Sequence, residues 1–583
     1  MQTTKMIFST SILASLLIAS GCTNPQMSSE KEEKRALSDS VEIIQKSDSP
    51  LVILPKNSTP AKIKIESLTE TPILGKTQLA EQPASGYLRE SATLKMGYSL
   101  DPKILPLRPP YTSQQESYNS KPENSFISTT NDPLSTFSID VDTASYSNIR
   151  RFIQNGHLPP VGAVRIEEMI NYFSYNYPEP QSESFSISAE IGPCPWQNEN
   201  RLVRIGIKAK DLNESQLPPS NLVFLVDVSG SMNRENKLPL LKKSLLMLVD
   251  KLNKKDRIAI VVYAGSDRVV LMPTSGSQKE TIRKAIHTLT SGGSTHASSG
   301  IQTAYDLALQ SFLPGGNNRI ILASDGDFNV GITSRGELER LITAKRESGV
   351  YLTVLGFGMG NFHDDSMEIL ADKGNGNYAY IDSLLEAKKV LIKERTSTLF
   401  ALANDVKLQI EFNPAKVGGY RLLGYENRIL ADEDFNNDKK DAGEIGVGHT
   451  VTALYEIIPA GSDAIPAVDQ LKYQDVVHTN QQSDEILTVK LRYKPLKEKQ
   501  SLLLSQSLHD NSNLLDQMST HFRFAAAVAG YGLLLQHSEY VGKFNYPDLI
   551  KLARSARGQD NEGYRAEFVR LLEMSEILNH YKT

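Results

Sequence analysis

The sequence is poor in cysteine and tryptophan and has no marked excess of charge of one sign. Two cysteines among 583 residues exclude a disulfide framework and a cysteine-rich zinc module. Lys and Arg number 63 against 68 Asp and Glu, so the chain lacks the basic excess of a typical nucleic-acid-binding protein. Beyond the N-terminus there is no apolar run of about 18 residues, which argues against a multi-span membrane protein.

What remains has the composition of a globular protein. Hydrophobic residues make up 40% of the chain and charged residues 22%, which excludes disorder throughout. At about 150 residues per domain, the length predicts three to four domains.

The first 21 residues have the pattern of an export signal. Lys5 precedes the mostly apolar stretch Met6–Ile18, which is too short to span a bilayer comfortably. The small residues that follow, up to Cys22, resemble a bacterial lipobox, with Ala19 where leucine is usual. The resemblance implies cleavage after residue 21, lipidation of Cys22 and membrane attachment in the cell envelope, with the outer membrane favoured if the cell has two. The alternative is an ordinary cleaved signal peptide in which Cys22 is incidental.

Two regions separate this signal from the central part of the chain. Residues 22–125 are rich in Ser, Thr, Pro, Gln, Glu and Lys, and we expect a largely disordered tether, because such a segment buries too little apolar surface to offset chain entropy. Residues 126–218 contain helical patterns and two alternating apolar–polar runs, which predict an N-terminal flanking domain of the α+β type.

Residues 219–395 alternate strands with helices. Four apolar runs predict buried strands, and amphipathic segments lie between them. The runs are Asn221–Val226, Arg257–Tyr263, Asn318–Ala323 and Tyr351–Phe357. This order predicts a doubly wound, mainly parallel α/β sheet of the Rossmann-like type. In such sheets, ligands bind at the carboxyl ends of the strands.

Polar side chains cluster at that predicted edge. Asp227, Ser229 and Ser231 follow the first strand, Thr295 precedes a helix, and Asp325 follows a later strand. Hydroxyl and carboxylate oxygens are the ligands of a hard cation such as Mg²⁺, which takes about six oxygens. We therefore predict a magnesium site at these five residues, with the two carboxylates acting through bound water and one position open to a partner's acidic group.

The same five residues match the metal-ion-dependent adhesion site of von Willebrand factor type A domains in order, spacing and placement. Further segments, including 138–151, 374–382 and 425–450, resemble a bacterial group of exported proteins in which an A domain lies between an N-terminal flanking domain and a C-terminal domain. The resemblance covers roughly residues 125–583. It implies that Mg²⁺, with Mn²⁺ or Ca²⁺ as possible substitutes, holds a protein partner.

The C-terminal region, 396–583, begins with alternating strands and ends in helices. Its strand Val406–Phe412 and the earlier strand Leu202–Ala209 flank the A domain in sequence. We expect these two strands to join one sheet, so that the N- and C-terminal flanks form one composite domain with the A domain inserted into it.

Two other acidic clusters resemble metal sites. Asp140 and Asp142 precede a helix, where capping by Asp142 or Thr143 is the favoured interpretation. The run from Asp432 begins like a calcium loop, but Asn437 replaces the turn glycine and Gly443 the final glutamate, so a solvated acidic loop is favoured.

Known enzyme motifs are missing from the sequence. It has no GxxxxGK[ST] phosphate loop, no HExxH and no GxSxG elbow. The favoured function is therefore that of a lipid-anchored envelope protein, not an enzyme, that binds a protein partner through a metal ion and binds no nucleic acid. A metal-assisted hydrolase using the same cation and an assembly scaffold with a structural metal are the alternatives.

Overall fold

The computed structural model describes residues 116–581, except for 140, 294–296, 327–334, 361, 467–482, 497, 499, 511 and 512. The chain divides into two units, Met1–Asp101 and Pro102–Thr583, and all described residues belong to the second. The expected signal peptide, the lipidated Cys22 and most of the expected tether lie outside the described residues.

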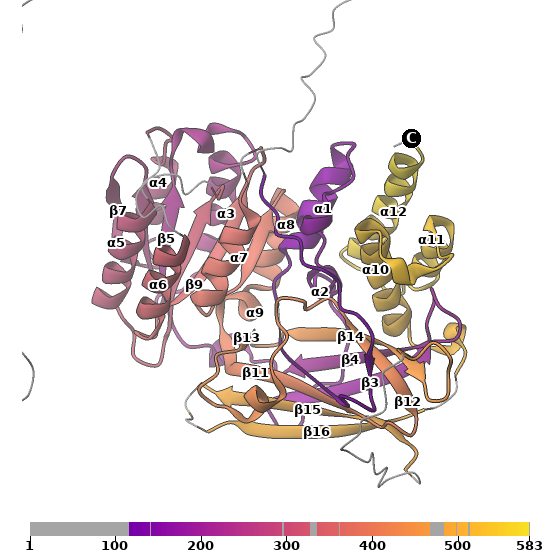
Figure 1. The fold of residues 1–583 in the computed structure, drawn as a ribbon. Coiled ribbons are helices and arrows are strands. Elements are labelled where there is room, and N and C mark those ends of the chain that lie inside the picture. Colours follow the sequence, from indigo (N-terminus) through magenta and orange to yellow (C-terminus); the bar gives the residue numbers. More distant parts are fainter. Residues whose placement is uncertain are drawn as a thin grey trace, which may run out of the picture. The chain divides into compact units, whose positions relative to one another are not determined.

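The central sheet has the predicted doubly wound form (Figure 1). Its strand order is β10-β9-β8-β5-β6-β7, and neighbouring strands are parallel except for the antiparallel edge strand β7. The strands are β5 (Ser220–Asp227), β6 (Arg257–Tyr263), β7 (Asp267–Ser275), β8 (Asn317–Ser324), β9 (Tyr351–Phe357) and β10 (Tyr378–Ile381).

Helices cover both faces of this sheet. Alternate residues of β5 enter two separate cores: Phe224 packs in one with α3 and α4, and Leu225 packs in the other with α5, α6 and α7. This alternation explains why β5 reads as a continuous apolar run. The helices are α3 (Leu238–Lys251), α4 (Lys279–His287), α5 (Ala297–Gln310), α6 (Arg335–Arg346), α7 (Asp364–Lys373), α8 (Leu384–Lys388), followed by a π-helical turn (Lys389–Lys393), and α9 (Arg395–Leu399).

Strands from both flanks of the A domain form a β-sandwich with one shared core. One sheet has the order β1-β12-β14-β4-β3; in the other, β13-β11-β15-β16, strand β2 also pairs with β11. The strands are β1 (Ile127–Ser128), β2 (Leu134–Ser138), β3 (Phe185–Pro193), β4 (Arg201–Ala209), β11 (Ala401–Phe412), β12 (Val417–Leu423), β13 (Gly443–Gly446), β14 (Thr450–Pro459), β15 (Glu485–Pro495) and β16 (Leu502–His509).

The two flanks therefore form one composite domain, but not through the expected strand pair. Strand β4 pairs with β14, whereas β11 lies in the opposite sheet and pairs with β2, β13 and β15. The expectation that β4 and β11 join one sheet is wrong. Apolar–polar alternation identifies each as a half-buried strand, yet it does not specify which strand lies beside it.

A helical layer completes the composite domain (Figure 1). Helices from both flanks share one core, and a methyl group on Gly532 of α10 would lie 2.7 Å from Ile166, which explains why this helix is rich in glycine and alanine. The helices are α1 (Ala144–Gln154), α2 (Ile166–Asn171), α10 (Thr520–Gln536), α11 (Tyr546–Ser555) and α12 (Tyr564–His580). Short 3₁₀ turns occupy Val161–Ala163, Glu214–Gln216, Gly230–Asn233, Asp432–Asn436, Leu515–Gln517 and Glu539–Val541.

Residues 116–125, which we expected to belong to the disordered tether, are part of the folded unit. The Ser117 amide donates to the Phe362 carbonyl at 2.9 Å, and the Asn124 side chain donates to the carbonyls of Leu422 and Gly424. The polar composition of this segment predicted disorder, because its hydrogen-bond partners are distant in sequence and could not be identified from it. Among the described residues, no helix combines the length and the apolar character that a membrane span requires.

Candidate functional site

Loops at the carboxyl ends of the sheet strands form the predicted site. The loop after β5 is held against the loop before α5 by two backbone hydrogen bonds: Gly230 donates to Gly293 at 3.1 Å, and Gly292 donates to Val228 at 2.7 Å. These bonds bring the Asp-x-Ser-x-Ser segment beside the loop that carries Thr295. Thr295 itself lies outside the described residues.

Asp227 is the buried centre of the site. Its carboxylate has no exposed surface; Oδ1 accepts a hydrogen bond from the Ser229 amide at 2.9 Å, and Oδ2 accepts one from the Ser324 hydroxyl at 3.0 Å. Burial and, to a smaller extent, the nearby charge of Asp325 raise the pKa of Asp227 to about 6, against the opposing effect of the hydrogen bonds from Ser229 and Ser324. At pH 7 the group is therefore mainly a carboxylate.

The two serine hydroxyls lie side by side. Ser229 Oγ and Ser231 Oγ are 3.0 Å apart, with Ser229 buried and Ser231 exposed. They lie on either side of Gly230, the first residue of the 3₁₀ turn Gly230–Asn233. Two hydroxyls beside one carboxylate fit a hard cation such as Mg²⁺, which accepts a few protein oxygens and retains water. The described residues contain no group of three or more His, Cys, Asp or Glu side chains suited to a metal.

Asp325 has a partner that the sequence did not predict. Its Oδ2 accepts a hydrogen bond from Lys237 Nζ at 2.7 Å, and both side chains are almost fully buried, with exposures of 1% and 4%. Lys237 immediately precedes α3, and 88 positions separate it from Asp325. A lysine at the start of a helix carries no local signal of such a contact.

Gly326, next to Asp325, brings the 358–364 loop against the site. Its φ is +82°, and a Cβ added there would lie 2.9 Å from the backbone nitrogen of His363. The other side of this loop contacts the N-terminal segment of the folded unit. Glu116 accepts hydrogen bonds from the Gly360 amide at 2.7 Å and from Arg151 at 2.8 and 3.0 Å.

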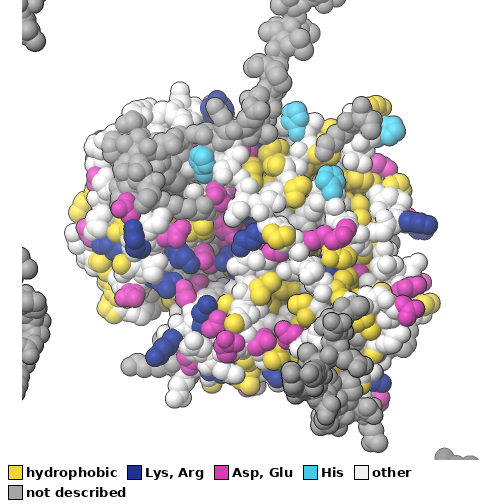
Figure 2. Space-filling view, in the orientation of Figure 1, with side chains coloured by type: hydrophobic (Ala, Val, Ile, Leu, Met, Phe, Trp, Pro, Cys, Tyr) yellow, Lys and Arg dark blue, Asp and Glu magenta, His cyan; other side chains and the backbone are white. Residues whose placement is uncertain are grey.

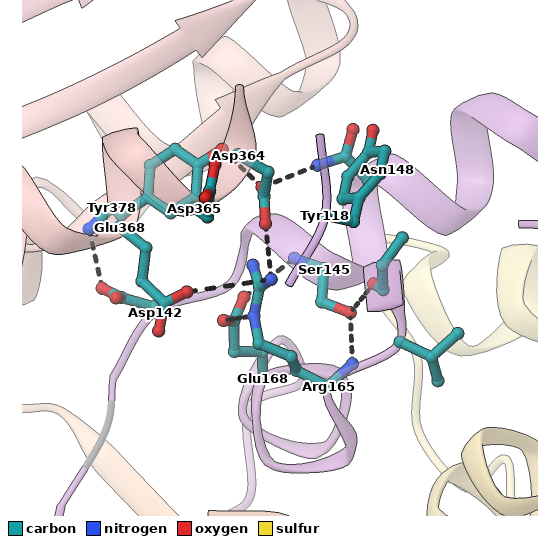
Figure 3. Close-up of polar contacts among 12 residues, drawn as sticks. Tyr118, Asp142, Ser145, Asn148, Arg165, Glu168, Asp364, Asp365, Glu368 and Tyr378 are labelled. Carbon is teal, nitrogen blue, oxygen red and sulfur yellow. Dashed lines mark hydrogen bonds and ion pairs between the residues drawn. The ribbon is translucent and has the colours of Figure 1, made fainter. Parts of the chain in front are cut away.

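A second contact joins α7 to the flanking helices (Figure 3). Arg165, just before α2, donates to Asp364 at the start of α7 and also pairs with Glu168. Asp364 accepts further hydrogen bonds from the Tyr378 hydroxyl at 2.7 Å and from Asn148. The loop beside the predicted site is therefore connected to the composite domain through buried charges.

The acidic clusters that we discounted as metal sites have protein partners. Of the two residues expected to cap α1, Thr143 is at the N-cap position, but its side chain makes no capping hydrogen bond. Asp142 does not cap the helix; its Oδ1 accepts from the Tyr378 amide at 2.7 Å, so it joins α1 to β10 instead. Asp140 lies outside the described residues. In the loop from Asp432, that residue accepts from Thr136, and Asp438 accepts from Ser501 and Arg492. These carboxylates face different partners and do not converge on one point.

Comparison with known proteins identifies the class of the central domain. The family model of the von Willebrand factor type A domain matches residues 221–393, and one described as von Willebrand factor matches residues 112–204. The structure of a von Willebrand factor type A protein from Catenulispora acidiphila is 15% identical and covers 67% of this chain and 91% of its own, with a TM-score of 0.38. Residues 221–393 form a von Willebrand factor type A domain, a class that generally mediates protein–protein interaction or adhesion.

The flanking regions specify the family further. The family model of the C-terminal region of the uncharacterized protein YfbK matches residues 397–578. YfbK of Escherichia coli is 42% identical over 506 residues, which cover 85% of this chain and 86% of YfbK. The uncharacterized protein sll0103 of Synechocystis is 28% identical over 190 residues, covering 32% of this chain and 43% of its own. The chain belongs to the YfbK family of von Willebrand factor type A proteins.

Proposed function

We propose that the protein binds a protein partner through a divalent cation held by Asp227, Ser229, Ser231, Thr295 and Asp325. The pair of serine hydroxyls beside a buried carboxylate is the observation that carries this proposal. When bound, Mg²⁺ supplies a positive charge that attracts an acidic side chain of the partner. Mn²⁺ or Ca²⁺ could take the same oxygen ligands.

The protein's own groups have distinct roles in this proposal. Asp227 provides the buried negative charge, and the Ser324 hydroxyl and Ser229 amide fix the orientation of that carboxylate. Ser231 is exposed and lies at the face from which a partner approaches. Basic and acidic side chains are interspersed over the face of the protein seen in Figure 2, which supports a protein partner more than a nucleic acid.

We further propose that the protein acts in the bacterial envelope, attached to the membrane by a lipid on Cys22, and that it is not an enzyme. The lipobox-like sequence before Cys22 supports the anchor. The missing enzyme motifs and the site's few carboxylates support binding over catalysis. Steady hydrolysis of an ester, phosphate or peptide, lost on substitution of Asp227, would instead favour a metal-assisted hydrolase.

The direct test is a pull-down from envelope extracts with the full chain as bait. The bait is used in Mg²⁺, in EDTA, and as the Asp227→Asn variant, with Asp250→Asn as a control because Asp250 is an exposed carboxylate of the same domain. We expect a partner whose retention falls at least tenfold in EDTA and with Asp227→Asn but not with Asp250→Asn. Equal retention in all four samples would contradict metal-dependent binding.

A further inference from the structure

The ion pair between Lys237 and Asp325 lies within the proposed metal site. Lys237 Nζ is 2.7 Å from Asp325 Oδ2, and the exposures of the two side chains are 4% and 1%. A lysine is seldom buried to this extent unless it is paired, because its ammonium loses the solvation of water. The contact is therefore a fixed part of the site, unlike a surface ion pair.

The fold provides a place for the lysine side chain. Gly358, at the end of β9, has a φ of +83°, and a Cβ added there would lie 2.1 Å from Lys237 Cε and 2.6 Å from Cγ. The Lys237 stem thus fills space that any other residue at position 358 would occupy. The backbone of Lys237 is held as well, since its amide donates to Arg234 and its carbonyl accepts from Leu241.

This pairing changes the charge available to a cation. Asp227 and Asp325 are the two carboxylates that we propose for the site, and the charge of Asp325 raises the electrostatic cost of ionising Asp227. The Lys237 ammonium compensates Asp325, so the site offers a net charge of about one negative unit instead of two. A dication bound there retains positive charge, which only an anionic group from outside can neutralise.

We propose that Lys237 is the residue that sets the cation affinity of this site: by compensating Asp325 it keeps the affinity of the free protein for Mg²⁺ low, so that the cation and an acidic partner bind cooperatively. The inference rests on the proposed function, because it concerns the same cation. It assigns to Lys237 a positioning role that acts through Asp325 and needs no contact with the ion. Cooperative binding of this kind makes cation and partner each raise the other's affinity by the same factor.

Mg²⁺ titration of the full chain without any partner tests the proposal. Lys237→Met removes the ammonium and keeps much of the side-chain length, and Lys243→Met is the matched control because Lys243 is exposed on α3, the helix that Lys237 precedes. Isothermal titration calorimetry with MgCl₂ should show at least tenfold tighter binding by Lys237→Met than by the wild type, and wild-type affinity for Lys243→Met. Equal or weaker binding by Lys237→Met would overturn the proposal.

A second variant separates charge from folding. Lys237→Met leaves Asp325 buried without its ammonium partner, so its metal-free form should be less stable. Lys237→Met/Asp325→Asn removes both charges, and its Mg²⁺ affinity should return to within about threefold of the wild type. A tenfold gain that persists in the double variant would overturn the proposal. If neither the wild type nor Lys237→Met binds Mg²⁺, the metal-dependent function itself fails, and the role of Lys237 fails with it.

Discussion

At the scale of single residues, the lack of a side chain at Gly326 allows two loops to approach each other closely at the proposed metal site. Gly326 adopts a positive φ between the loop of Asp325 and the backbone of His363. Its amide donates to the Ser324 hydroxyl at 3.0 Å, and that hydroxyl donates to Asp227. A substitution at Gly326 that shifts the backbone therefore also disturbs the hydrogen bond between Ser324 and the buried Asp227 carboxylate.

We predict that Gly326→Ala destabilises the protein by about 1–3 kcal/mol, because the new Cβ both strains a positive φ and meets the His363 backbone at 2.9 Å. The measurement is the free energy of unfolding in urea. Gly336→Ala is the control: this residue lies in α6 with nothing within 4 Å of the added Cβ. The same substitution should there stabilise the protein by about 0.5–1 kcal/mol. Equal effects of the two substitutions would contradict this account of Gly326.

The residues of the site differ in how far sequence could identify them. Asp227, Ser229 and Ser231 are recognisable because they lie within five positions after an apolar strand, where local spacing determines geometry. Asp325 follows a second such strand, and parallel strands bring both ends to one edge. Lys237 could not be found in this way, since its contact depends on the space left by Gly358, which directly follows a third strand.

At the scale of elements, buried ion pairs join the A domain to the helices of the composite domain. Arg165 lies between Glu168 of α2 and Asp364 of α7 (Figure 3). Arg150 of α1 forms a second tie, with Asp382 at 2.6 Å and Glu386 at 2.7 Å. Because α7 follows the loop that packs on Gly326, these contacts hold the surroundings of the proposed metal site in place.

We predict that Arg165→Met lowers the free energy of unfolding by about 3–5 kcal/mol, because it leaves two buried carboxylates without their guanidinium partner. Arg283→Met is the matched control, since its pairs with Asp250 and Glu280 are exposed, and it should change stability far less than Arg165→Met does. The measurement is equilibrium denaturation. A small effect of Arg165→Met, similar to that of the control, would show that the ion pairs of Arg165 contribute little to stability.

Strands with strong hydrophobic signals were predicted well. The runs Arg257–Tyr263 and Tyr351–Phe357 have the same bounds as β6 and β9, because both are buried along almost their whole length. Strands β7 and β10 were not predicted. Strand β7 is mostly half-exposed at the sheet edge and contains a proline, and β10 has only four residues, so neither produces a distinctive pattern.

At the scale of the whole folded unit, the flanks of the A domain depend on each other. Strand β2 pairs with β11 and β4 pairs with β14, so segments separated by more than 240 residues complete the same sheets. Sequence alone indicated a composite domain from the order of the elements. It could not give the pairing, because many half-buried strands have the same alternation and only the three-dimensional packing selects the partner.

One consequence of this packing is a predicted loss of stability in mild acid. His449, whose carbonyl accepts from Ala209 at the end of β4, has its pKa lowered to about 4 by burial and by the charges of Lys389 and Lys208. In the unfolded chain the pKa of His449 is about 6.5. Between pH 6.5 and 4 the unfolded state therefore binds more protons than the folded state, and the free energy of unfolding falls as the pH is lowered.

We therefore expect the wild type to lose about 1–2 kcal/mol of unfolding free energy through His449 between pH 7 and pH 5. This part of the loss should be missing in His449→Gln. His287→Gln, which alters an exposed histidine of α4, should retain the wild-type pH dependence. Urea denaturation at the two pH values measures the difference. Identical pH dependence of the wild type and His449→Gln would contradict the role of His449.

The central claim, that the loops at the strand ends hold a divalent cation, is tested most directly by diffraction from crystals of the protein grown with Mn²⁺. Mn²⁺ takes the oxygen ligands of Mg²⁺ and scatters X-rays anomalously, so its position can be identified without assumption. We predict an anomalous peak within about 2–2.5 Å of the Ser229 and Ser231 hydroxyl oxygens and close to Asp227, and no such peak in Asp227→Asn. A wild-type crystal at saturating Mn²⁺ without a peak at these hydroxyls would contradict the account.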